Sequence, residues 1–175
     1  MEVKKFMGKH IILLLLYLGD TLGASFVGLS RVVKSVFLFG EEVKDTIRVG
    51  GSIVEMPSFG ECVTSDEIIN DVMFLIGLGF VEDTMLPEMK SAIEFDEYVQ
   101  WVDSFASGEE RDILICDINL HKFALTDKGR GFIEKVWWVL ISEYHKGVVL
   151  KFVQGITDAS FGGLCRYMYL HYGDV

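Results

Sequence analysis

Residues 64–82, TSDEIINDVMFLIGLGFVE, contain the pattern that decides the fold. Thr64 and Glu67 have the spacing of a capping box, in which the hydroxyl accepts a hydrogen bond from a backbone amide and the carboxylate reaches back, so a helix begins here. Apolar residues at helical spacing then predict one buried face: Ile68, Ile69, Val72, Met73, Leu75 and Ile76. Gly79 suits the left-handed residue that ends a helix, and residues 80–82 predict a strand directly after it.

The predicted partner of this strand is residues 122–125, at the start of a second informative stretch. Thr126 is suited to cap the helix that follows. Asp127 in the first turn is negatively charged and interacts favourably with the positive end of the helix dipole. We expect that helix to run to about Tyr144. A helix, a β-hairpin and a further helix in this order predict a winged helix-turn-helix.

Two helices are expected before this stretch. The first, at about residues 3–18, is apolar on all sides in its second half, so we expect it to be buried on all sides. The second, at about residues 25–42, has an apolar face formed by Phe26, Leu29, Val33, Val36 and Phe37. Arg31 and Lys34 fall on its opposite, polar face. Residues 53–56 predict a short strand between the second helix and the third.

The chain is therefore expected to be one domain, residues 1–175, mainly α with a small β-hairpin (α+β). To the winged helix it adds an acidic insertion at about residues 83–120, with a helix at about 87–106 and a strand near 113–116, and C-terminal helices at about 126–172, the last two near 148–153 and 160–172. At this length the chain can bury a core without a metal or a disulfide.

Four stretches of the chain resemble archaeal winged-helix proteins of uncharacterised role. They are MPSFGECVTSDEIINDVMFLIGLGFVE (56–82), FALTDKGRGFIEKVW (123–137), KHIILLLLYLGD (9–20) and LCRYMYLHYGD (164–174). Those proteins are distantly similar to the Panacea or SocA-like antitoxin domain. The resemblance covers about two thirds of the chain and has no counterpart for residues 83–120. It implies regulation or protein–protein recognition, and it brings no catalytic residues.

The net charge of −10 is concentrated in one segment of the chain. Residues 82–117 carry two basic and eleven acidic side chains, whereas residues 118–175 carry seven basic and five acidic ones. The predicted solvent face of the helix at 64–78 has no lysine or arginine and consists of Ser65, Asp66, Glu67, Asn70 and Asp71. Because DNA binding depends on neutralising phosphates with cations, we expect a duplex to repel this helix.

These charges favour a non-enzymatic regulatory or adaptor protein that acts mainly through protein contacts. The alternative is a DNA-binding transcriptional regulator that uses a basic patch at the wing. The candidate residues for that patch are Arg31, Lys34, His121, Lys122, Lys128 and Arg130. Alternatively, these six residues are ordinary solvated surface side chains.

The acidic insertion contains a candidate site for a protein partner. Aromatic residues ringed by carboxylates suit a basic partner, because the rings give an apolar centre and the charges steer the encounter. The residues are Tyr98, Trp101, Glu94, Glu97 and Asp103. The alternative is a peripheral helix that packs on the wing and keeps a hydrated outer face.

A second candidate interface is the tryptophan pair Trp137 and Trp138. Eight of the ten residues at 132–141 are apolar, so we expect this helix to be covered on most sides. The two rings either fill the core or form the interface of a homodimer, since tryptophan is enriched in interface hot spots.

Enzyme motifs are missing from the sequence, which has no GxGxxG, GxxxxGK, HExxH or GxSxG. The four histidines are far apart: His10, His121, His145 and His171. Metal sites usually have paired ligands at helix or loop spacing, so we expect no metal, no cofactor and no small-molecule substrate.

The cysteines and the N-terminus bear on the compartment. Cys62, Cys116 and Cys165 are far apart and odd in number, which favours free thiols in a reducing cytoplasm. Lysines followed by an apolar run have the outline of a signal peptide, but Asp20 interrupts the pattern. The eight apolar residues at 11–18 are too few to cross a membrane, so we expect a core helix there.

Overall fold

The structure is a computed structural model, and it describes residues 8–43, 48–49, 52–53, 65–85, 100 and 121–173. Within these residues the protein is mostly helical with a small antiparallel sheet, so the predicted α+β class is confirmed. The elements are α1 (Gly8–Thr21), β1 (Phe26–Val27), α2 (Leu29–Glu42), β2 (Arg48–Val49), β3 (Ser52–Ile53), α3 (Ser65–Gly77), β4 (Val81–Met85), β5 (His121–Leu125), α6 (Asp127–Phe132), η1 (Ile133–Trp137), η2 (Trp138–Leu140), α7 (Glu143–Asp158) and α8 (Phe161–Tyr172).

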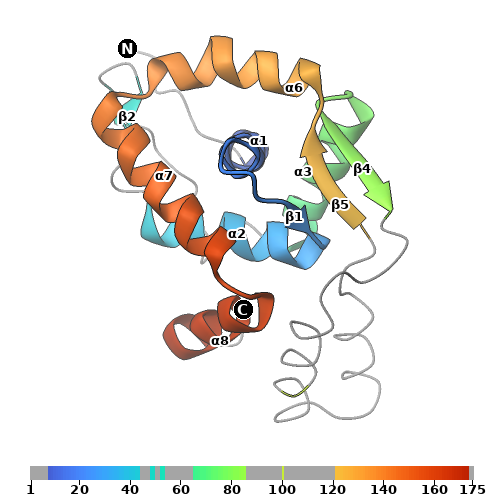
Figure 1. The fold of residues 1–175 in the computed structure, drawn as a ribbon, viewed down its shortest axis with the longest axis vertical. Helices are drawn as coiled ribbons and strands as arrows, with labels where there is room; N and C mark the ends of the chain where they lie inside the picture. The colour runs from blue at the N-terminus through green and yellow to red at the C-terminus, as the bar shows by residue number, and fades with distance from the viewer. Residues whose placement is uncertain are drawn as a thin grey trace.

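Helix α1 lies at the centre of the molecule. Figure 1 views it end-on, with α2, α6, α7 and the strands β4 and β5 arranged around it. Every residue from Ile11 to Leu16 is at most 3% exposed. The helix packs against α2, α3, α7, β5 and η1, so each of its sides meets another element. The prediction that its second half is buried on all sides is therefore confirmed.

The three-stranded sheet has the order β1-β5-β4, and both pairs are antiparallel. The predicted pairing of residues 80–82 with 122–125 is confirmed, and the ladder extends from Val81 opposite Leu125 to Met85 opposite His121. The buried side chains of this ladder include Val81 and Leu125, which join the core around α1.

The second helix begins later than predicted, because the residues before it form strand β1. Phe26 lies opposite Phe123 of β5, and the Gly28 amide donates to the His121 carbonyl oxygen at 2.8 Å. Gly28 has a φ of 87°, a conformation that favours glycine and that ends the strand before α2 starts at Leu29. Pairing with a strand distant in sequence thus replaces the first turn of the predicted helix.

The end of α3 confirms the predicted role of Gly79, which has a φ of 70°. The Phe80 amide donates to the Leu75 carbonyl at 2.9 Å, and the Gly79 amide donates to the Ile76 carbonyl at 2.9 Å. These two bonds form a Schellman motif, which closes the helix and leads straight into β4. The proposed capping residue at the other end of α3, Thr64, lies outside the described residues.

Thr126 joins the end of α3 to the start of α6. Its hydroxyl donates to the Gly79 carbonyl at 2.7 Å and accepts from the Gly129 amide at 3.1 Å. The Thr126 amide donates to the Phe80 carbonyl at 3.1 Å. The predicted cap is therefore confirmed, and the same residue also fixes where α3 meets the sheet.

The long helix predicted to reach Tyr144 is wrong, because it is interrupted. α6 passes into one π-helical segment, η1, and one 3-10 segment, η2, and the chain becomes extended at Ile141. Ser142 then caps a new helix, since its side chain accepts from the His145 amide. α7 is accordingly longer than the short helix predicted at 148–153. The predicted last helix is confirmed, with Ser160 as its cap.

Two further predictions fall largely outside the described residues. The strand predicted at 53–56 overlaps β3, which pairs with β2 as a separate hairpin, and residues 54–56 lie outside the described part. The helix predicted at 87–106 also lies outside it, except for Gln100, and so does the strand near 113–116.

The contact between α6 and the end of α3 gives the first test. A Cβ added at Gly129 would press against the Phe80 carbonyl oxygen and lie 3.0 Å from its carbonyl carbon. We expect Gly129→Ala to lower the free energy of unfolding by about 1–3 kcal/mol in urea, because a backbone group must move. Gly131 on the same helix has nothing within 4 Å, so Gly131→Ala should raise it by up to about 1 kcal/mol. Equal effects of the two substitutions would contradict this packing.

Candidate functional site

Arg31 is not a surface cation, so its predicted place on the polar face of α2 is wrong. The residue is 8% exposed. Its guanidinium donates to the carbonyl oxygens of Ile156 and Ala159, each at 2.7 Å. Both carbonyls lie at the C-terminal end of α7, where the helix dipole places partial negative charge. Arg31 therefore attaches α2 to the junction of α7 and α8 and is unavailable to a phosphate.

Three other residues of the predicted basic patch are engaged within the protein. His121 Nδ1 lies 2.7 Å from Asp83 Oδ1, across the hairpin of β4 and β5. Lys128 Nζ donates to the Leu78 carbonyl at 2.7 Å and lies 4.6 Å from the centre of the Phe80 ring. Arg130 forms an ion pair with Asp20. Each of these side chains thus contacts an acceptor within the chain itself.

Lys34 and Lys122 complete the predicted patch, and neither forms an ion pair within the described part of the chain. They lie on different elements, Lys34 on α2 and Lys122 on β5 opposite Thr84. The six predicted cations are thus distributed over α2, β5 and α6. Over residues 65–85, which contain α3 and β4, there are five acidic residues and no basic one.

The outer face of α3 differs in character between its two halves. Glu67 and Asn70 are exposed, as predicted. Further along, three large apolar side chains are also exposed: Met73 at 50%, Phe74 at 51% and Leu78 at 42%. We call Met73, Phe74 and Leu78 the α3 apolar face. The prediction that Met73 belongs to the buried face is wrong.

An ion pair borders the α3 apolar face at the start of α1. Lys9 Nζ lies 3.3 Å from Asp71 Oδ1 and 4.7 Å from the centre of the Phe74 ring. Lys9 is thus held between a carboxylate and an aromatic ring, an arrangement in which both contacts favour the cation. The pair neutralises Asp71 locally.

Trp137 is buried in the core, which favours the first of its two interpretations, a ring that fills the core. Its ring centre lies 4.3 Å from that of His10. Burial of His10, and secondarily the nearby Lys9, lower the pKa of this histidine. The neutral imidazole is therefore favoured beside the indole.

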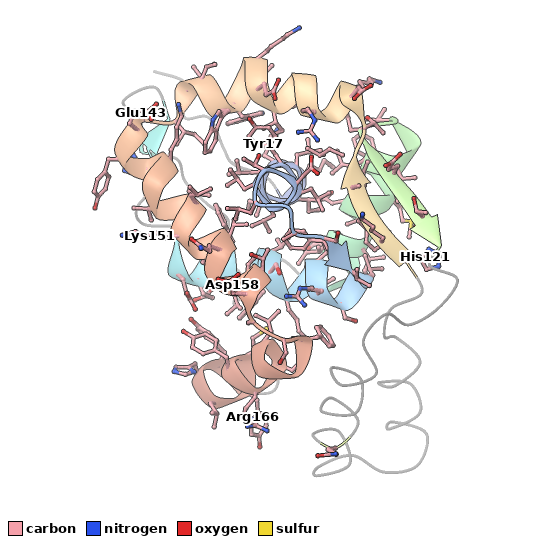
Figure 2. All side chains as sticks on the ribbon, viewed as in Figure 1. Tyr17, His121, Glu143, Lys151, Asp158 and Arg166 are labelled. Atoms are coloured by element: carbon pink, nitrogen blue, oxygen red, sulfur yellow. The ribbon has the colours of Figure 1, made fainter. Side chains whose placement is uncertain are left out.

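Trp138 also has partners within the chain, although it is only half-buried. Its ring meets that of Tyr17 edge-on at 5.7 Å, and Figure 2 shows Tyr17 between α1 and the helical segment that follows α6. Lys146 Nζ lies 5.2 Å from the ring centre. The apolar side chains that do face solvent here are Val136 and Val139, the latter 63% exposed. The prediction that this helix is covered on most sides is therefore wrong.

Helix α8 presents a tyrosine-rich surface that the sequence reasoning did not single out. Tyr167 stacks on His171 at 4.2 Å, and a hydrogen bond to Glu42 raises the pKa of Tyr167 to about 12. Tyr172 packs edge-on against Phe37 at 5.4 Å, which attaches α8 to α2. Figure 2 shows Arg166 on the side of α8 that faces away from the body.

Metal and membrane sites can be assessed only for the described part of the chain. Within it, no group of three or more histidine, cysteine or acidic side chains could hold a metal ion. No helix there is both long and apolar enough to cross a membrane. The predicted partner-binding residues of the insertion lie outside the described residues; they are Glu94, Glu97, Tyr98, Trp101 and Asp103.

Comparisons with known proteins identify no relative of this chain. No protein-family model matches it, and no curated protein or solved structure does either. The resemblance to winged-helix proteins near the SocA-like antitoxin domain therefore stays a prediction.

The buried position of Arg31 leads to a stability test. Arg31→Met leaves two carbonyls at the end of α7 without this donor, and buried polar groups that lose a partner cost about 1–3 kcal/mol each. We expect the free energy of unfolding, measured in urea, to fall by at least about 2 kcal/mol. The matched control is Lys34→Met one turn along α2, which should change it by less than about 0.5 kcal/mol. A neutral Arg31→Met would show that the guanidinium does not hold these carbonyls.

Proposed function

We propose that this protein is a winged-helix regulatory or adaptor protein that acts through contacts with another protein and not by catalysis. The order of the elements supports the winged helix. α1, β1, α2 and α3 precede a hairpin, β4–β5, whose second strand pairs with β1. In such a domain α3 takes the position of the recognition helix and the hairpin is the wing.

The α3 apolar face is the observation that carries the proposal. A helix that enters the major groove is drawn to the duplex by cations and contacts base edges with polar groups. α3 instead offers Glu67 and Asn70, followed by exposed Met73, Phe74 and Leu78. Exposed apolar side chains gathered in this way are typical of protein interaction sites.

The engagement of the wing cations supports the same proposal. His121, Lys128 and Arg130 all have acceptors within the chain, and Arg31 is buried. DNA binding would have to break these contacts or depend on Lys34 and Lys122. The five acidic residues of 65–85 outnumber the cations that approach them, so this surface attracts a polyanion weakly.

We also propose a cytoplasmic location, which the cysteine chemistry supports. Cys165 is a buried free thiol. Burial raises its pKa to about 11, so it stays protonated and unreactive at neutral pH. A buried free thiol of this kind suits a reducing compartment.

Fluorescence anisotropy with random-sequence duplex DNA tests the proposal at about 50–200 mM salt, the range in which phosphate contacts show themselves. We expect no saturable binding at the lowest salt, because α3 is acidic and most wing cations are engaged. Lys122→Ala and Arg130→Ala should leave that result unchanged.

The opposite outcome would be equally clear. Micromolar binding that collapses with salt, with a salt slope reduced by about one unit in Lys122→Ala, would assign the protein to the DNA-binding regulators. The proposed protein-recognition role of α3 would then be wrong.

A further inference from the structure

The exposed residues of α3 form one continuous stripe along the helix. They are Glu67, Asn70, Met73, Phe74, Gly77 and Leu78, whereas Ile68, Val72 and Leu75 on the other side are buried. From the first to the last of the exposed positions the stripe is about 16 Å long at the usual rise per residue. This is the length of a surface that three turns of a second helix can cover.

Four residues of the stripe have the spacing of a helix-packing hole. Asn70, Met73, Phe74 and Gly77 stand at positions i, i+3, i+4 and i+7, and all four are exposed. In helix pairs, four residues at this spacing surround one side chain inserted from the facing helix. Gly77 leaves one corner open, because a Cβ added there would meet nothing within 4 Å. Met73 on the other side is flexible and adapts to an inserted group.

The charges around the hole favour a cationic partner. Residues 65–85 contain five acidic residues and no basic one, and the whole chain carries −10. Two cations approach this region, Lys9, which pairs with Asp71, and Lys128, which binds the Leu78 carbonyl, so the acidic residues stay in excess. Glu67 lies at the start of the stripe, one turn before the hole.

We propose, resting on the protein-recognition function above, that α3 accepts one basic amphipathic helix of a partner protein. A large apolar side chain of that helix enters the hole formed by Asn70, Met73, Phe74 and Gly77. Lysine or arginine residues flanking the apolar side chain lie toward Glu67 and the other carboxylates of residues 65–85. The apolar contact provides the anchor, and the charges select and steer the partner.

A second copy of this chain is a poorer occupant. Two copies of a chain that carries a net charge of −10 repel each other, and like charges oppose association. An acidic partner helix meets the same repulsion. The sign of the partner's charge is therefore the part of the proposal most open to test.

The test uses the whole protein and three synthetic peptides that share a length and a leucine content. In one, leucines follow the heptad spacing and the remaining positions are mostly lysine. In the second, glutamate replaces the lysines. In the third, the lysine peptide is scrambled so that it has no apolar face. Binding is measured by isothermal calorimetry at physiological salt, where nonspecific attraction between exposed charges is partly screened.

We expect only the amphipathic lysine peptide to bind, with Phe74→Ala weakening it by about tenfold, as the loss of an interface anchor does. Met73→Ala serves as a second variant of the same hole. The control is Val139→Ala, a smaller apolar truncation at a more exposed residue of another element, which should alter the affinity by less than about twofold.

Several results would overturn the proposal. In the first, the scrambled peptide binds as tightly as the amphipathic lysine peptide, and Phe74→Ala has no effect. In the second, the glutamate peptide binds and Phe74→Ala weakens it. In the third, none of the peptides binds. A dimer of the protein that Phe74→Ala dissociates in sedimentation equilibrium would assign the face to a second copy instead. A different result would contradict the wider protein-recognition function, namely salt-dependent binding of duplex DNA.

Discussion

Helix α1 has no polar residue between Ile11 and Leu16, so none of its sides can face water at low cost. Burial of all sides requires several neighbouring elements, and the chain supplies them from both of its halves. α2 and α3 follow α1 directly, whereas β5, η1 and α7 come from the second half of the chain. The apolar surface of one helix thereby brings the two halves of the domain together.

The position of α3 follows from this arrangement. One side of α3 packs on α1 and α2 through Ile68, Val72 and Leu75, and its end is tied to the sheet by Gly79 and Thr126. A helix held at its end and along one side keeps its opposite side in a fixed orientation. The exposed stripe with Phe74 is consequently a preorganised surface, which lowers the ordering cost of binding.

The ends of the helices also explain where two of the candidate cations lie. Arg31 binds carbonyls at the C-terminal end of α7, and Lys128 binds the Leu78 carbonyl just after α3. These are places where unpaired carbonyls and the helix dipole favour a positive charge. These two cations, which look available in the sequence, thus complete the ends of helices.

The sequence predicted those features that depend on local chemistry. The cap at Thr126 and the left-handed Gly79 each follow from a few adjacent residues, and both are confirmed. The predicted pairing of β4 with β5, which joins residues far apart in the sequence, is also confirmed. The exposure of Met73 could not be predicted, because residues 72–76 are apolar throughout and periodicity cannot choose a buried side.

Other features depend on distant partners. Arg31 is buried because carbonyls 125 and 128 positions away accept from it. The break between η2 and α7 occurs without proline or glycine, where Ser142 begins a new helix within an apolar run. The sequence predicted that the outer face of α3 is acidic. Its apolar half, Met73, Phe74 and Leu78, could be identified only from the way α3 packs on the core.

Native-state hydrogen exchange of the backbone amides tests most directly whether α1 organises the domain. The amides of α1 from Ile12 to Leu18 should exchange only through global unfolding, with an opening free energy equal to that from urea unfolding. Those of α8, which packs mainly on α2, should exchange through local opening at a lower free energy. Exchange of the α1 amides as easily as those of α8 would contradict the account, because α3 and the sheet would then have no common core.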